Sequence, residues 1–126
     1  MVKKLYPLCE NHLFSRAYRK GKSDANKYVA VYVLKNYSKR KDNSGCTTRL
    51  GITVNKKLGG AVKRSRVKRI IRAAYRENMP KLKEGYLIIV AARSAAFDKD
   101  VKSTDIVPKM YKSFEKLGLI ASVNGN

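Results

Sequence analysis

The segment that most constrains the fold is Tyr86–Ala92, a continuous apolar run with no polar interruption. A run of this kind, bounded by polar segments, is typical of a strand that is buried on both faces of a sheet. At 126 residues the chain has the length of one domain. The sequence therefore predicts a single domain, residues 1–126, with one sheet and helices packed on it.

Two other segments have the composition of strands. Tyr28–Lys35 is rich in β-branched and aromatic residues, and its alternation places three valines on one face and Tyr28 and Tyr32 on the other. Thr47–Asn55 alternates between apolar residues, expected to face inward, and small or polar ones. The polar segment Ser38–Gly45 between them suits a loop. The two strands are therefore expected to form an antiparallel pair.

Three helices are predicted. The first runs from Asn11 to Lys20, and Gly21 is expected to end it in the left-handed conformation. The second covers about Gly60–Asn78, and the third covers about Asp105–Leu117, with Gly118 after it. Together the elements predict an α+β fold in the order α-β-β-β-α-β-α, with a mixed sheet of about four strands.

The boundaries and the compartment follow from the remaining composition. The ordered core is expected over about 8–118, followed by a tail at 119–126. No apolar run approaches the ~20 residues of a membrane span, and the first residues lack the apolar stretch of a secretory signal. Cys9 and Cys46 fit neither a disulfide framework nor a metal-binding motif. We therefore expect free thiols, no membrane association and a cytoplasmic protein.

The charge of the chain indicates a polyanionic partner. Lysine and arginine number 29 against 9 aspartate and glutamate, which gives a net charge of +20. Hydrophobic content is 44%, so this charge is carried by a chain that can fold. A charge of this size opposes compaction unless an anion neutralises it. Nucleic acid is the first candidate and an anionic membrane surface the second.

The basic residues concentrate in the second helix. The window Lys56–Arg76 contains nine basic residues and no acidic one. On a helical wheel one narrow stripe is apolar and the opposite side is cationic, with Arg64 and Arg66 on its two edges. The apolar stripe contains Val67, Ile70, Ile71 and Ala74, and the opposite side contains Ser65, Lys68, Arg69, Arg72 and Arg76.

The pattern favours a phosphate-binding face over two alternatives. A merely solvated face usually mixes signs, because like charges three or four residues apart are unfavourable on a helix. A membrane-surface helix needs a wider apolar face with bulky anchors. Arginine, which dominates here, matches phosphate geometry with two parallel hydrogen bonds. We therefore predict binding to the backbone of a nucleic acid.

The run from Arg49 to Arg72 closely resembles the signature of the bacterial ribonuclease P protein subunit, in which a strand, a Lys-Lys pair and a Gly/Ala-Val turn precede an Arg-Asn-Arg-x-x-Lys-Arg helix. The resemblance extends to Phe14, Tyr18 and Gly21 and to Tyr86–Arg93, and it covers roughly residues 10–117. One position departs from the signature, because Ser65 stands where the family has asparagine.

The resemblance implies a function in tRNA maturation. The protein would assist the endonucleolytic removal of the 5′ leader from precursor tRNA, while the RNA subunit holds the Mg²⁺ ions and performs the hydrolysis. It also implies a left-handed β-α-β crossover. The resemblance implies no required protein partner, and it leaves self-association open. Residues implied to contact the RNA subunit are Lys56, Arg64, Ser65, Arg66, Lys68, Arg69 and Arg72.

The resemblance also implies a separate cleft for the leader, between the first helix and the sheet, lined by Phe14, Tyr18, Tyr32, Thr53 and Lys57. Aromatic faces beside a cation suit an unpaired strand, because bases stack on rings without a sequence code. From helical spacing alone, Phe14 and Tyr18 predict core packing. The family resemblance assigns them to the cleft instead.

The chain offers no catalytic or metal site by sequence. A metal-dependent nuclease needs clustered carboxylates or histidines, whereas His12 is the single histidine and Asp98 and Asp100 lie in an expected loop. The leading hypothesis is therefore a binding subunit of an RNA-based endoribonuclease. The alternative is a non-enzymatic RNA-binding module, such as a ribosomal protein or an RNA chaperone.

Overall fold

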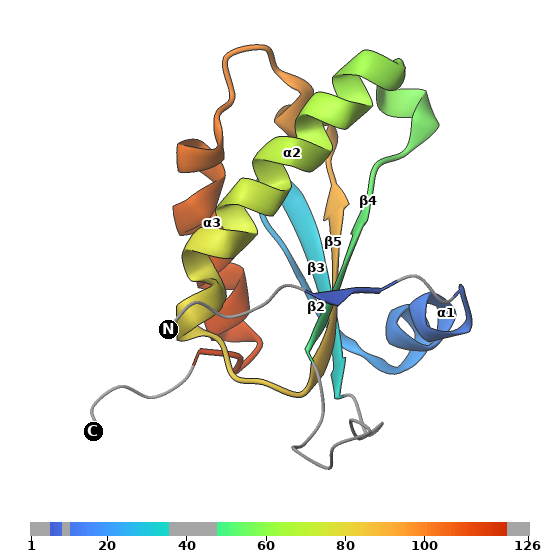
Figure 1. The fold of residues 1–126 in the computed structure, drawn as a ribbon, viewed down its shortest axis with the longest axis vertical. Coiled ribbons are helices and arrows are strands. Elements are labelled where there is room, and N and C mark those ends of the chain that lie inside the picture. Colours follow the sequence, from blue (N-terminus) through green and yellow to red (C-terminus); the bar gives the residue numbers. More distant parts are fainter. Residues whose placement is uncertain (1–5, 9–10, 36–47, 121–126) are drawn as a thin grey trace.

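The computed structural model describes residues 6–8, 11–35 and 48–120. In these residues a mixed sheet has α1 on one face and α2 and α3 on the other (Figure 1). The strands are β1 (Tyr6–Pro7), β2 (Lys22–Ala25), β3 (Val29–Lys35), β4 (Arg49–Thr53) and β5 (Tyr86–Ala92), and the helices are α1 (Asn11–Lys20), α2 (Ala61–Asn78) and α3 (Ser103–Lys116). The predicted Ser38–Gly45 loop and both cysteines lie outside the described residues.

The predicted α+β class is confirmed, but the predicted pairing of β3 with β4 is wrong. The strand order is β1-β4-β5-β3-β2, so β5 lies between these two strands. It pairs antiparallel with β3 and parallel with β4. The physical reason is burial, since the most apolar strand gains most from the centre of the sheet. The two-residue β1, parallel to β4, brings the described sheet to five strands instead of about four.

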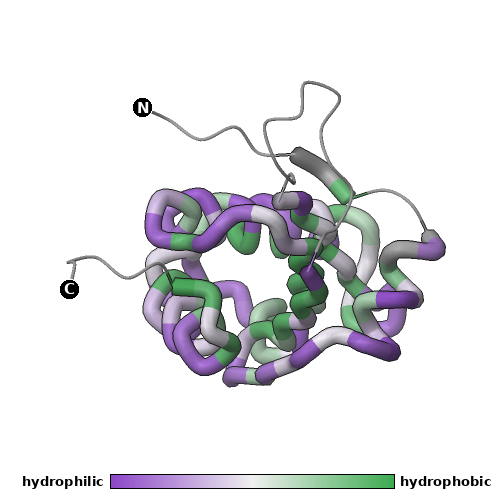
Figure 2. The backbone as a smooth tube through the Cα atoms, turned by 90° about the horizontal axis from the view of Figure 1, so that it is seen from below, coloured by the Kyte–Doolittle hydropathy of each residue, from purple (hydrophilic) through white to green (hydrophobic). Residues whose placement is uncertain are grey.

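Alternate residues of β5 face the two helical layers, as the continuous apolar run predicts. Ile88 and Val90 pack with α2 and α3, whereas Leu87 and Ile89 pack under α1. The valines of β3 join the first of these clusters. In Figure 2 the strands are the greenest part of the tube and lie between α1 on one side and α2 and α3 on the other.

The first helix has the predicted bounds, but Gly21 ends it for a different reason. Gly21 is not in the left-handed region, where the structure places Gly118 with a φ of 76°. A Cβ at Gly21 would instead press against the carbonyl oxygens of Ala17 and Val33. Glycine is therefore required by the close approach of α1 to β3, whereas Gly118 ends α3 as predicted.

The third helix begins at Ser103, two residues before the predicted start. The Asp105 carboxylate accepts a hydrogen bond of 2.9 Å from the Lys102 amide and so caps the first turn. Beyond the helix, Leu119 is fully buried and Ile120 forms a bridge with Leu82. The packed part of the chain therefore extends slightly past residue 118.

Asn26 fixes the turn between β2 and β3 to the helical layer. Its side-chain oxygen accepts hydrogen bonds from the amides of Tyr28 and Val29, and its side-chain nitrogen donates to Ser113 Oγ at 2.9 Å. Its own carbonyl accepts from the Arg93 guanidinium at 2.8 Å. Tyr28 precedes β3 and packs with the α2 and α3 cluster. The prediction that it shares a face with Tyr32 is therefore wrong.

Candidate nucleic-acid interface

The apolar side of α2 lies where the sequence predicts it. Val67, Ile71 and Ala74 are fully buried in the main core, and Ile70 is half-buried beside them. Tyr75 is also buried there, in an edge-to-face contact with the Phe114 ring at 6.1 Å. Burial raises the pKa of the Tyr75 hydroxyl well above its usual value. This side of α2 therefore packs in the core and is not available to a ligand.

The opposite side of α2 is a cationic face, defined here as Lys68, Arg69, Arg72 and Arg76. All four side chains are exposed, as is the neighbouring Ser65. None of the four has an ion-pair or hydrogen-bond partner among residues 6–8, 11–35 and 48–120. Their charge is therefore not neutralised by the described part of the chain, which leaves it available to an external polyanion.

The two edge arginines are engaged with their own chain. Arg64 Nε donates to the Gly59 carbonyl at 3.2 Å. The Arg66 guanidinium donates to three carbonyls of the loop before α3, those of Asp98, Lys99 and Val101. The sequence shows the helical position of Arg66 but not these acceptors, which lie more than 30 residues away. Arg66 thus holds the loop, and only part of its guanidinium is available to RNA.

We expect Arg66→Lys to lower the free energy of unfolding by about 1–2 kcal/mol, because one ammonium cannot reproduce the guanidinium's contacts with three carbonyls. The charge is retained, so the salt dependence of RNA binding should stay unchanged. Urea unfolding of the variant checks the first expectation, with Arg69→Lys as the exposed control that should unfold like the wild type. Equal unfolding midpoints for all three proteins would contradict the assigned role.

On the other side of the sheet, three aromatic side chains form what we call the aromatic face, namely Phe14, Tyr18 and Tyr32. The Tyr18 and Tyr32 rings meet edge to face with centroids 4.7 Å apart, and Tyr18 is 43% exposed. Phe14 is half-buried in the core beneath α1, with its ring where a side chain at Gly51 would lie, 2.5 Å from an ideal Cβ. Core packing therefore explains Phe14 in part, but not the exposed Tyr18 ring.

A row of small side chains lies next to the aromatic face. Thr53, Ala91, Ala30 and Ala25 are in register across four neighbouring strands. They share the face of Tyr32, because Ala30 precedes Tyr32 by two residues on β3 and side chains two residues apart on a strand point to the same face. Lys56 and Lys57 lie in a 3₁₀ turn just beyond β4 and are exposed. The predicted cleft residues thus lie on one face of the sheet or at its end, with direct ring contact between Tyr18 and Tyr32.

A hollow of about 190 Å³ connects the aromatic face with the cationic face. We call it the edge hollow, because it opens at β4 where the strand extends beyond its pairing with β1. Its lining combines apolar residues of the sheet side with two cations of α2, and consists of Leu8, Phe14, Leu50, Gly51, Ile52, Lys68 and Arg72. The two surfaces that the sequence assigns to separate ligands therefore meet at this edge.

Residues 6–8, 11–35 and 48–120 lack two other features, a metal-binding cluster and a membrane-spanning helix. These residues bring no three histidine, cysteine, aspartate or glutamate side chains together in a group that could hold a metal ion. No helix formed by them has both the length and the apolar character needed to cross a bilayer.

Comparison with known proteins identifies the family. Residues 2–118 match the family described as Ribonuclease P. The chain is 42% identical over 111 residues to the ribonuclease P protein component of Clostridium acetobutylicum, covering 88% of this chain and 87% of that one. It is 38% identical over 119 residues to that of Symbiobacterium thermophilum, covering 94% and 96%. The chain belongs to the ribonuclease P protein family.

Solved structures agree with this assignment. The fold matches a Staphylococcus aureus RNase P protein mutant with a TM-score of 0.76 and 33% identity, covering 91% of this chain and 90% of that one. It matches the Thermotoga maritima RNase P protein with a TM-score of 0.68 and 26% identity, covering 95% and 100%. The chain is thus a subunit of ribonuclease P, the endoribonuclease of tRNA 5′ processing, in a ribonucleoprotein with the ribonuclease P RNA. The ribosomal-protein alternative is set aside.

Proposed function

We propose that the cationic face of α2 binds the ribonuclease P RNA and that the aromatic face binds the 5′ leader of precursor tRNA. The observation that carries the proposal is the edge hollow, where Phe14 of the aromatic face lies beside Lys68 and Arg72 of the cationic face. A leader emerges from the cleavage site, so its binding surface must adjoin the surface that holds the RNA subunit.

The chemistry of each surface supports its assignment. Exposed guanidinium and ammonium groups without internal partners bind phosphates and release counterions. An exposed ring beside a row of small side chains offers an unpaired base a flat surface for stacking. Lys57, just beyond β4 at the end of the same face, adds charge for the strand's backbone, and the neighbouring Lys56 adds charge for the RNA subunit. This combination needs no base-specific contacts, which suits leaders of differing sequence.

In this proposal the RNA subunit holds the Mg²⁺ ions and carries the hydrolysis. The protein adds positive charge where the RNA subunit and its substrate meet, which lowers the Mg²⁺ concentration that the complex needs. It acts in the cytoplasm, where precursor tRNA is made, and requires no protein partner. The protein itself positions the leader and touches no reacting atom.

The proposal is tested by cleavage of precursor tRNA at a series of Mg²⁺ concentrations. A bacterial ribonuclease P RNA is assayed alone and with an equimolar amount of this protein, with the 5′ fragment as the readout. We expect the protein to shift half-maximal cleavage to a lower Mg²⁺ concentration. Unchanged Mg²⁺ dependence, with the RNA–protein complex shown to be formed, would contradict the proposal.

A further inference from the structure

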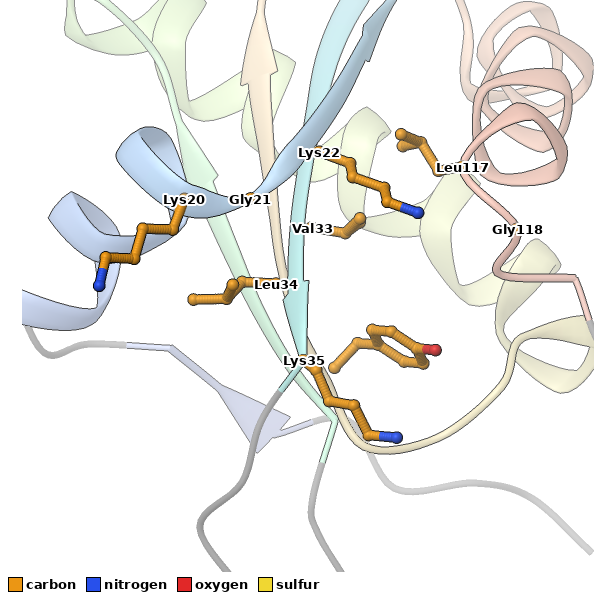
Figure 3. Close-up of a pocket in the computed structure, with 9 residues that line it drawn as sticks. Lys20, Gly21, Lys22, Val33, Leu34, Lys35, Leu117 and Gly118 are labelled. Atoms are coloured by element: carbon orange, nitrogen blue, oxygen red, sulfur yellow. The ribbon is translucent and has the colours of Figure 1, made fainter.

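A second hollow lies at the Lys22 end of β2 and the Lys35 end of β3, where it reaches from the end of α1 to the end of α3. We call it the lysine hollow; it has a volume of about 340 Å³, within the range of small-molecule sites. It is lined by Lys20, Gly21, Lys22, Val33, Leu34, Lys35, Tyr86, Leu117 and Gly118. Figure 3 shows the side chains of Lys22 and Lys35 extending toward the side of Leu117 and Gly118, whereas that of Lys20 extends to the opposite side.

Register explains why two cations converge on this hollow. Lys22 of the edge strand β2 lies opposite Val33, and Lys35 follows two residues later on the same face. Diagonal neighbours of this kind lie roughly 7–8 Å apart, within reach of long side chains. Both lysines are exposed and without an ion-pair or hydrogen-bond partner in the part of the chain that the structure describes. An external anion between them would relieve their repulsion.

The floor of the lysine hollow is apolar and partly aromatic. Tyr86 lies opposite Lys35 in register and is half-buried against the main core together with Leu117. Val33 is buried beneath them. A ligand that fits this lining has a flat apolar part, which packs on the floor of the hollow. It also has an anionic group that lies near the ammonium groups of Lys22 and Lys35. A nucleotide has this chemistry, with its base on the ring and its phosphate at the lysines.

We propose that the lysine hollow binds one unpaired nucleotide of the ribonuclease P RNA. The hollow is at the Lys35 end of β3, whereas Ala30 of the small-residue row is at the other end and on the opposite face. Lys22, Lys35 and Tyr86 share the face opposite the aromatic face, so a leader would have to pass the Lys20–Gly21 end of α1 to reach them. The α2 helix, by contrast, packs on the same face of the sheet as these three side chains, over β4 and β5, with α3 beside it over β3 and β2.

The first test uses adenosine monophosphate and inorganic phosphate as separate probes in amide NMR titrations of the whole protein. We expect adenosine monophosphate to shift the amides of Lys35, Tyr86 and Gly118, and inorganic phosphate to shift them less. These shifts should disappear in Lys22→Gln/Lys35→Gln and persist in Lys99→Gln/Lys109→Gln, which removes the same charge at exposed positions outside the lining of the hollow. Equal shifts with both probes, or none with adenosine monophosphate, would overturn the nucleotide assignment.

The second test distinguishes the source of the nucleotide. Lys22→Gln/Lys35→Gln should weaken binding to the ribonuclease P RNA roughly tenfold and lower its salt slope by one to two, relative to the Lys99→Gln/Lys109→Gln control. The difference in affinity between precursor and mature tRNA should stay unchanged in the holoenzyme. If that difference decreases while RNA-subunit binding stays intact, the occupant is the leader and the proposal is wrong. The exposed lysines contribute no core contacts, so both variants should fold.

Discussion

Replacing Lys68, Arg69 and Arg72 together with glutamine should weaken binding to the ribonuclease P RNA on the order of a hundredfold at physiological salt. These side chains are exposed and unpartnered among the described residues, so their loss should remove phosphate contacts without unfolding α2. Glutamine has nearly the helix propensity of lysine and arginine. Titration at several salt concentrations should show the slope reduced by roughly two to three.

A charge-matched variant controls for the net charge of the protein. Lys83→Gln/Lys109→Gln/Lys112→Gln removes three exposed charges outside α2 and both hollows. We expect it to change the affinity much less, because long-range attraction is screened within about 8–10 Å at these ionic strengths. Equal losses in the two triple variants would show that total charge, and not the cationic face, governs binding.

Tyr18→Ala should weaken binding of precursor tRNA by the holoenzyme roughly tenfold or more and leave binding of mature tRNA unchanged. The reason is that Tyr18 is the exposed ring of the aromatic face, and stacking of one base contributes about 1–3 kcal/mol. Equilibrium binding of the two tRNAs, differing only in the leader, measures the effect directly. The edge-to-face contact with Tyr32 is also lost, at a cost to stability of about 0.5–1.5 kcal/mol.

Tyr18→Phe is the matched control, since it keeps the ring and removes the hydroxyl. It should bind precursor tRNA like the wild type. Phe14→Ala should weaken leader binding too, but with a larger loss of stability, because its ring packs over Gly51 and joins the core under α1. A Tyr18→Ala protein that lost affinity for both tRNAs equally would argue against leader binding at this face.

Local sequence patterns predict the bounds of the helices and strands well, but they do not predict which strands pair with each other. Helix and strand bounds follow from periodicity and end residues, which act over a few positions, and so Asn11–Lys20 and Tyr86–Ala92 are placed correctly. The order of strands depends on contacts between distant segments. The loop expected between β3 and β4 favours pairing of these two strands, but it acts only on neighbours in the sequence. The apolar run of β5 predicts only that this strand is buried on both faces, and the structure adds that it lies between β4 and β3.

The same limit applies to the candidate site. The wheel correctly separates the buried Val67 and Ile71 from the exposed Lys68 and Arg72, because it needs only the helical period. It does not show that Arg66 is held by carbonyls of residues 98–101. The small-residue row and the lysine hollow are likewise products of strand register. The cationic character of one helix can be predicted from its sequence alone. A surface formed by several strands can be predicted only when the order and register of those strands are known.

The meeting of two binding surfaces at the β4 edge has a thermodynamic consequence. Lys68 and Arg72 line the same hollow as Phe14. A change in the positions of these two cations on binding of the RNA subunit therefore changes the affinity of the aromatic face for the leader. Linkage then requires reciprocity, so that the factor by which the RNA subunit changes leader affinity equals the factor by which the leader changes the affinity of the protein for that RNA. Substrate would thus tighten the assembly that processes it, and product release would loosen it again.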